Sequence, residues 1–161
     1  MFRTQAGFRT QAGTLALIVF AALAVPSSAA EKKITKSQLP AAVAKTAKQQ
    51  SIGATVLGYS QDRENGQLEY EVQMTTGGHS KDVTIAPDGQ LLEIEEQVKL
   101  TSLPLKVQAA LHRKAGKGTI TKVESLVKHG ALVAYEAQVL NAGRHSEVQV
   151  GPGGETLQHE E

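Results

Sequence analysis

The 161-residue sequence carries 17 Lys and Arg residues against 16 Asp and Glu residues, a formal net charge of +1, and contains no cysteine. This balance excludes the strongly basic field that is typical of proteins that bind nucleic acid. The absence of cysteine excludes disulfides and thiolate metal sites, so the fold must be held by packing alone.

Residues 1–30 have the three parts of a secretory signal peptide. Arg3 and Arg9 precede the uncharged apolar run "TLALIVFAALAV", which is followed by the small residues "PSSAA". A membrane span needs about 20 apolar residues, so this shorter run favours cleavage over anchoring. We expect cleavage near Ala30, with a cut after Ala29 as the alternative. The mature protein is then expected to be periplasmic or secreted, without a stable membrane anchor.

The remaining chain contains one unit twice. The stretch "YEVQMTTGGHSKDVTIAPDGQLLEIEE", which begins at Tyr70, matches "YEAQVLNAGRHSEVQVGPGGETLQHEE", which begins at Tyr135. The two copies lie about 65 residues apart, and repeats of this length are supersecondary units that bury a face against a neighbour. We therefore predict two repeats, residues 31–98 and residues 99–161.

Each repeat is predicted to open with a helix. Ser37 and Thr101 are the expected N-caps, each followed by a proline in the first turn, where a missing N–H costs no helical hydrogen bond. Apolar side chains recur at i, i+4 and i+8, which gives each helix one apolar stripe. The residues of these stripes are Leu39, Val43 and Ala47 in the first helix and Leu103, Val107 and Leu111 in the second.

Four strands are predicted after each helix. In "LEYEVQM", residues 68–74, apolar and polar residues alternate as in an antiparallel strand with one buried face. Turns are expected at "ENG", "TGGH" and "PDG", and the second copy repeats the pattern up to a last strand at Leu157. The predicted fold class is α+β: two tandem αββββ repeats with helices packed on antiparallel sheets. Whether the two sheets are continuous is left open.

The repeated motifs "LP…V…A", "YEVQ" and "V.I.PDG..L" resemble those of the PepSY-like group, whose fold is similar to that of the β-lactamase inhibitory protein. The resemblance covers essentially all of the chain after residue 30. It implies an extracytoplasmic, non-catalytic binding or inhibitory module, with peptidases or other secreted enzymes among its partners. Tight inhibitory interfaces use buried aromatic anchors. This part of the chain has three tyrosines and neither Trp nor Phe, so tight inhibition of a β-lactamase is not expected.

No catalytic motif is found in the sequence. It holds no G-x-S-x-G elbow, no H-E-x-x-H helix and no cysteine nucleophile. No two histidines stand at a close helical or strand spacing for a shared metal ion. We therefore expect a protein that is not an enzyme and that requires neither a cofactor nor a resident metal.

The polar residues of the predicted strands define a candidate binding face. In each repeat they alternate with inward-facing apolar residues, so we expect them on the outer side of the sheet. A solvated surface explains the same pattern without a partner. The candidate residues are Glu69, Glu71, Gln73, Glu136 and Gln138.

A second candidate site lies at the two equivalent hairpins, at His79, Lys81, Arg144 and His145. Together with the basic stretch "LHRKAGKG", these residues favour an alternative function, an envelope sensor or scavenger that binds cations or anionic polymers. Solvated hairpins, and cations that complement a helix dipole, explain the same residues.

The leading functional hypothesis is an exported, non-catalytic binding module. Its expected partner is a protein or peptide in the cell envelope or outside the cell, not a nucleic acid. Inhibition or regulation of a secreted or periplasmic enzyme is the form of binding that the PepSY-like resemblance implies.

Overall fold

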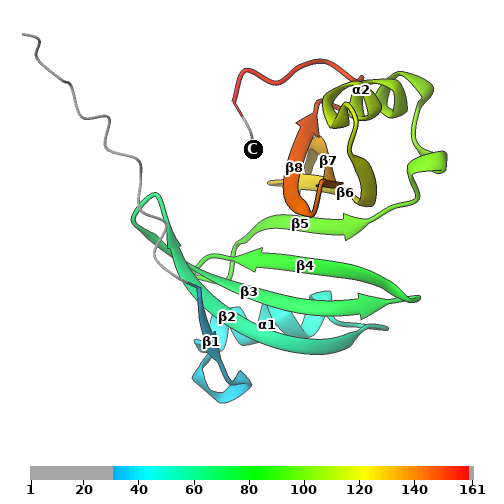
Figure 1. The fold of residues 1–161 in the computed structure, drawn as a ribbon. Coiled ribbons are helices and arrows are strands. Elements are labelled where there is room, and N and C mark those ends of the chain that lie inside the picture. Colours follow the sequence, from blue (N-terminus) through cyan, green and yellow to red (C-terminus); the bar gives the residue numbers. More distant parts are fainter. Residues whose placement is uncertain (1–30, 160–161) are drawn as a thin grey trace, which may run out of the picture.

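The computed structural model describes residues 31–159, so the predicted signal peptide and its cleavage site lie outside the described residues. This range contains eight strands and two α-helices, each α-helix being followed by a run of consecutive strands (Figure 1). In chain order they are β1 (Lys32–Ile34), α1 (Ala41–Gln50), β2 (Thr55–Glu64), β3 (Gln67–Thr76), β4 (His79–Ile85), β5 (Leu91–Gln97), α2 (Leu105–Ala115), β6 (Thr119–Lys128), β7 (Ala131–Asn141) and β8 (Arg144–Val150). Within residues 31–159, neither helix has the length and apolar character needed to cross a membrane.

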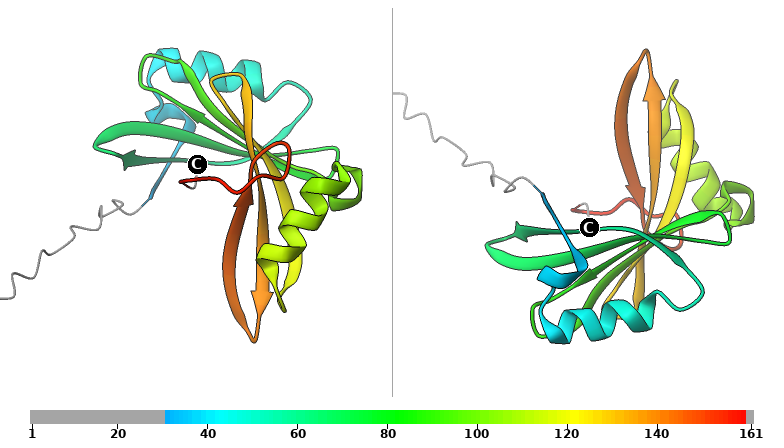
Figure 2. Two further views of the ribbon diagram at one scale, coloured as in Figure 1. Left: turned by 90° about the horizontal axis from the view of Figure 1, so that it is seen from above. Right: turned by 90° about the horizontal axis from the view of Figure 1, so that it is seen from below.

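All eight strands belong to one antiparallel sheet in the order β1 to β8. The two predicted repeats, residues 31–98 and 99–161, are joined by direct pairing of β5 with β6, in which Glu95 lies opposite Leu126. The sequence left the continuity of the sheet open, and this pairing makes it continuous. Figure 2 shows that the strands of the second repeat run across those of the first, as expected of a strongly twisted sheet.

Both helices start later than the sequence predicted. Short 3-10 helices at Lys36–Gln38 and Leu100–Ser102 precede α1 and α2, and the residue before each proline, Leu39 or Leu103, is extended. The reason is the proline itself, because its ring disfavours the helical region for the preceding residue. Ser37 and Thr101 therefore lie inside the 3-10 turns, and their prediction as N-caps of the helices was wrong.

The second repeat lacks the fourth strand that the sequence predicted at Leu157. Residues 155–157 carry no regular secondary structure and residues 158–159 form a bend, whereas the equivalent segment of the first repeat is β5. At the position aligned with Ile94, which packs against the first core, the second repeat has His159. A polar residue there removes the apolar contact that anchors the last strand of the first repeat.

The two helices cover the same face of the sheet. Val83 of β4 belongs to the group of buried residues that packs against α1, which we call the first core. Val83 lies opposite Ile94 of β5, and Ile94 lies opposite Val127 of β6. Val127 and Val123 lie four residues apart on β6, so their side chains are on the same side of the sheet. Val123 belongs to the group of buried residues that packs against α2, which we call the second core. The fully buried side chains include Val43, Val72, Met74, Val83 and Ile85 around α1, and Val107 and Leu111 on α2.

Equivalent turns close both repeats against their helices. Gly89 follows β4 at a φ of +90°, and a Cβ there would lie 2.9 Å from the carbonyl oxygen of Ala42. Gly154 follows β8 at a φ of +84°, and its Cβ would lie 2.6 Å from the carbonyl oxygen of Lys106. The repeated glycine of the "PDG" and "PGG" turns therefore allows the turn to touch the first turn of a helix.

Candidate functional site

The residues predicted as a binding face lie on one face of the sheet, opposite the helices. We call this the polar face and define it by the side chains that alternate with the core residues. Glu71 lies opposite Ser60 of β2 and Thr84 of β4, while Glu136 lies opposite Glu124 of β6 and Gln149 of β8. The shared orientation of the five predicted residues follows from this register, but binding by them stays a prediction.

Strands β4, β5 and β6 fill the space between the two predicted groups with further carboxylates. An open pocket crosses β2 to β6, and seven of its nine lining residues are acidic. Its lining consists of Asp62, Glu64, Glu69, Glu71, Asp82, Thr84, Glu93, Glu95 and Lys128. The polar face is therefore much more acidic than the near-neutral chain as a whole.

Two lysines partly neutralise these carboxylates. The Nζ of Lys122 lies 2.6 Å from Oε1 of Glu124, and the Nζ of Lys128 lies 3.7 Å from Oε2 of Glu93. The side chain of Glu124 is only 4% exposed, so its ion pair is well shielded from water. Such a pair matters mainly because loss of Lys122 would leave a buried carboxylate without its counter-charge.

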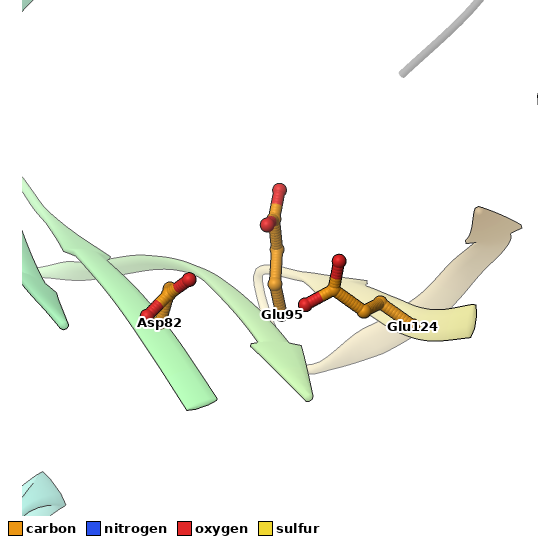
Figure 3. Close-up of side chains that lie close together, drawn as sticks. All are labelled: Asp82, Glu95 and Glu124. Atoms are coloured by element: carbon orange, nitrogen blue, oxygen red, sulfur yellow. The ribbon is translucent and has the colours of Figure 1, made fainter. Parts of the chain in front are cut away.

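Three carboxylates converge at the centre of the polar face. One oxygen from each of Asp82, Glu95 and Glu124 lies within 4.8 Å of the other two. Figure 3 shows them on three adjacent strands, with Glu95 standing between the other two. Glu124 also accepts a hydrogen bond from the Oγ of Ser80 (3.3 Å), in addition to its ion pair with Lys122.

This convergence changes the acidity of the central residues. Burial, and after it the nearby carboxylates of Glu93, Glu124, Glu136 and Asp82, raises the pKa of Glu95 to about 8. Burial is also the main cause of the raised pKa of Asp82. Both effects disfavour the charged form, so protons are bound at the centre of the polar face at a pH where carboxylates are normally ionised.

The same two causes act at the outer end of the pocket. Burial raises the pKa of Glu69, and the carboxylates of Glu64 and Asp62 add to it. Burial likewise raises the pKa of Asp62, next to Glu64 and Glu31. The acidic character of the polar face thus extends from β2 to β7, rather than being confined to one cluster.

Hydrogen bonds hold several of these side chains in place. The carboxylate of Glu71 accepts bonds from the Oγ of Ser60 (3.2 Å) and the Nε2 of Gln73 (3.1 Å). The Nε2 of Gln149 donates to Oε2 of Glu136 at 2.8 Å. Such ordered acceptors lower the entropy that must be lost when a partner binds.

The hairpin candidates are distributed over different surfaces. Lys81 lies on the helix side of the sheet, where its Nζ donates to the carbonyl of Gln50 at 3.5 Å. His145 alternates with Glu147 on the polar side of β8, and Arg144 lies on the other side. In the described part of the chain, no hydrogen bond or ion pair joins the His79 hairpin to the Arg144 hairpin. A shared ligand at these residues stays an untested prediction.

The basic stretch that the sequence singled out forms the end of α2. His112, Arg113 and Lys114 lie in the last helical turn, and the carbonyl of His112 accepts a bond from the N–H of Gly116. Positive charges at this end complement the partial negative charge of the helix terminus. This position accounts for the basic residues without a polyanionic ligand.

The sequence prediction missed the centre of the polar face. Asp82, Glu95 and Glu124 were not among its candidates, although Asp82 and Glu95 alternate with apolar residues in "KDVTI" and "LEIEE", and Glu124 follows the apolar Val123 in "KVESL". Alternation could have placed each on the polar side of its own strand. Their convergence depends on the β5–β6 pairing, which no periodicity within a single strand reveals.

Comparison with solved structures supports the fold. The chain is similar to a BLIP-like protein from Bacteroides fragilis, with 17% identity, a TM-score of 0.56 and coverage of 76% of this chain and 85% of that one. It is also similar to a DUF2874 family protein from Bacteroides ovatus, with 18% identity, a TM-score of 0.59 and coverage of 74% of this chain and 85% of that one. A third similar structure is a candidate periplasmic protein from Bacteroides eggerthii (18% identity, TM-score 0.60, 74% and 86% covered).

At these identities the likeness shows the fold: an α+β arrangement of two helices on an antiparallel sheet, as in the BLIP-like protein. No protein-family model and no curated protein matched the sequence.

Proposed function

We propose, with the BLIP-like fold as the premise, that this chain is an exported, non-catalytic protein-binding module that uses its polar face to bind a basic segment of a partner. The observation that carries the proposal is the concentration of carboxylates on the face of the sheet that no helix covers. A surface of one charge attracts a partner of the opposite charge and fixes its orientation.

The location outside the cytoplasm is part of the proposal. It is supported by the signal-like residues 1–30 and by the description of similar structures as candidate periplasmic proteins. Inhibition or regulation of a secreted enzyme is one way in which such a module would act. The resemblance to BLIP-like proteins supports this role through the fold alone.

The polar face also offers hydrogen-bonding groups suited to lysine and arginine. The pocket between β2 and β6 places carboxylates from different strands within reach of one another, so a guanidinium or ammonium group can contact more than one. In the free state, the raised pKa values of Asp82 and Glu95 and the lysines beside Glu93 and Glu124 neutralise only part of this charge. A basic partner would neutralise the rest.

A cation-binding role has weaker support. The Asp82, Glu95 and Glu124 oxygens converge, but Lys122 and Ser80 already bind Glu124 within the chain. We therefore regard this trio as the acidic centre of a protein-binding face. Chelation with EDTA distinguishes the two roles, because a protein contact made through carboxylates alone does not require a metal ion.

The test is affinity capture from a periplasmic or culture fraction with residues 31–161, with and without EDTA, followed by affinity measurement for the captured protein. Neutralising Glu69→Gln and Glu136→Gln together is expected to weaken binding about tenfold, which corresponds to about 1.4 kcal/mol. Salt is expected to weaken wild-type binding more than binding of the double variant.

The matched control is Asp88→Asn with Glu155→Gln. It removes the same amount of charge from the two turns that contact the helices, away from the polar face, and an amide oxygen can still accept the bonds made there. Equal loss of affinity in both double variants would mean that net charge, not the polar face, determines binding. Loss of capture in EDTA would favour the cation role instead.

A further inference from the structure

The last strand of the sheet has an open edge. In the first repeat, β4 pairs with β3 on one side and β5 on the other, while in the second repeat the equivalent strand β8 pairs only with β7. Figure 2 shows β8 as the outermost strand of its half of the sheet in both views. The backbone groups along this outer edge have no neighbouring strand in the described chain.

The residues of β8 are more exposed than the equivalent residues of β4, as expected if β8 has only one neighbouring strand. The first four residues of β8, Arg144 to Glu147, are exposed, whereas the aligned residues of β4, His79 to Asp82, are half-buried. The two strands have similar sequences and both follow a tight hairpin. The absent neighbour therefore accounts for the difference.

In the first repeat, the turn after β4 leads into β5, which pairs with β4. The equivalent turn after β8 is also formed. The N–H of Gly89 donates to the carbonyl of Ala86 and that of Gly154 to the carbonyl of Gly151, both at 2.8 Å. A second bond closes each turn, from Ala86 to Gln90 in one and from Gly151 to Glu155 in the other. Beyond Glu155 no strand pairing follows in the described residues, so the hairpin is started but not extended.

We propose that the open edge of β8 accepts an extended segment of a partner protein, which adds a ninth strand in the position that β5 takes beside β4. Strand addition to an exposed sheet edge is a common mode of peptide recognition, in which backbone hydrogen bonds give affinity and alternate side chains give specificity. This inference goes beyond the proposed function, because the contact is made by the backbone of β8 rather than by the carboxylates of the polar face.

The register of the first repeat indicates the side chains of the added strand. On the helix side, Ile94 lies opposite Val83, so an aliphatic residue is expected opposite Val148. On the polar side, Glu95 lies opposite Asp82, but the exposed carboxylate of Glu147 favours a basic residue in that place, because like charges directly opposite are destabilising.

The neighbouring charges agree with this assignment. Glu147 lies opposite Gln138 of β7, and the next residue of β8 on the polar side, Gln149, binds the carboxylate of Glu136. The positive charge of Arg144 lies at the hairpin end of β8. The added strand is therefore expected to alternate aliphatic and basic residues, with its basic positions away from this hairpin.

A synthetic peptide with the β5 sequence, modified at two positions, is a suitable probe. In Leu-Leu-Lys-Ile-Lys-Glu-Gln, lysines replace the residues equivalent to Glu93 and Glu95. We expect saturable binding to residues 31–161 and slower hydrogen exchange of the β8 backbone amides that face away from β7. The same peptide with methylated backbone nitrogens keeps the side chains but loses the donors, and is expected not to bind.

A charge exchange tests the register. The exposed Glu147→Lys variant is expected to bind the lysine peptide several-fold more weakly and to bind the unmodified peptide Leu-Leu-Glu-Ile-Glu-Glu-Gln several-fold more strongly. Fold integrity is checked by the amide exchange of the core strands β3 and β7, which should be unchanged.

Three results would overturn the inference. Protection of the outward-facing β8 amides, those that do not bond to β7, in the free protein at every concentration would mean that the chain's own C-terminal segment covers the edge. Protection that appears only with rising protein concentration would mean that a second copy does. Peptide binding that protects β3 to β6 but not β8 would overturn the edge site while leaving the polar-face function standing.

Discussion

Replacing Glu95 with glutamine is expected to stabilise the protein at pH 9 by a few kcal/mol, at most about 5 kcal/mol, and to have little effect at pH 5. The folded pKa of Glu95 is raised to about 8 from an ordinary value of 4.5, mainly by burial. Between these two values the folded state holds a proton that the unfolded state releases. Stability is therefore lost as the pH rises through this window, and each tenfold difference in proton affinity between the two states corresponds to about 1.4 kcal/mol.

The measurement is urea unfolding of both proteins from pH 5 to pH 9. The wild-type free energy of unfolding should fall as the pH rises from about 4.5 to about 8, and the fall should be much smaller in Glu95→Gln. Glu96→Gln is the control, because Glu96 is the next residue of β5 and lies on the opposite side of the sheet, across from Lys81. Parallel pH profiles for wild type and Glu95→Gln would show that Glu95 is not the proton-binding group.

Replacing Gly154 with alanine is expected to destabilise the protein by about 2–4 kcal/mol. Alanine at a φ of +84° costs about 1–2 kcal/mol in backbone strain, and its Cβ would lie 2.6 Å from the carbonyl oxygen of Lys106. The helix or the turn must move to relieve this contact. Thermal and urea unfolding of Gly154→Ala measure the loss.

Gly143→Ala separates the two causes. Gly143 has a similar φ of +78°, but no atom would lie within 4 Å of its Cβ, so only the backbone strain of about 1–2 kcal/mol is expected. Gly89→Ala, whose Cβ would approach Ala42 at 2.9 Å, should resemble Gly154→Ala. Equal losses at Gly143 and Gly154 would contradict the close approach of the turn to α2.

The parts of the fold that depend on local patterns could be predicted from the sequence. Alternation in "LEYEVQM" predicted β3 and its buried face, and the internal match of the two predicted repeats predicted the order of helices and strands from α1 to β8. The short strand β1, which precedes α1 and pairs with β2, was not predicted. Tyr70 is buried as the alternation requires, and Tyr135 packs against the second core. These features depend on residues close together in the sequence.

The sequence analysis did not predict the places where a single residue interrupts the regular pattern of the repeat. The prolines after Leu39 and Leu103 delayed the start of each helix, and His159 in place of an isoleucine removed the last strand. In both cases the repeat suggested more regularity than the side chains support. Local backbone restriction and loss of an apolar contact decided the outcome.

The candidate face was predicted only in part for a related reason. Glu69 and Glu136 were recognised from the alternation in their own strands, and both lie on the polar face. The acidic centre around Glu95 results from the pairing of β5 with β6 across the junction of the repeats. A sequence that specifies each strand does not by itself specify which carboxylates become neighbours across such a junction.

The polar face as the binding surface is tested most directly by carboxyl-group labelling of residues 31–161, free and bound to the captured partner. We expect Glu69, Glu93 and Glu136 to be labelled more slowly in the complex, while Asp88 and Glu155 in the turns are labelled at unchanged rates. Slower labelling of Asp88 and Glu155, with the polar-face glutamates unaffected, would place the partner on the helix side and contradict the proposed function.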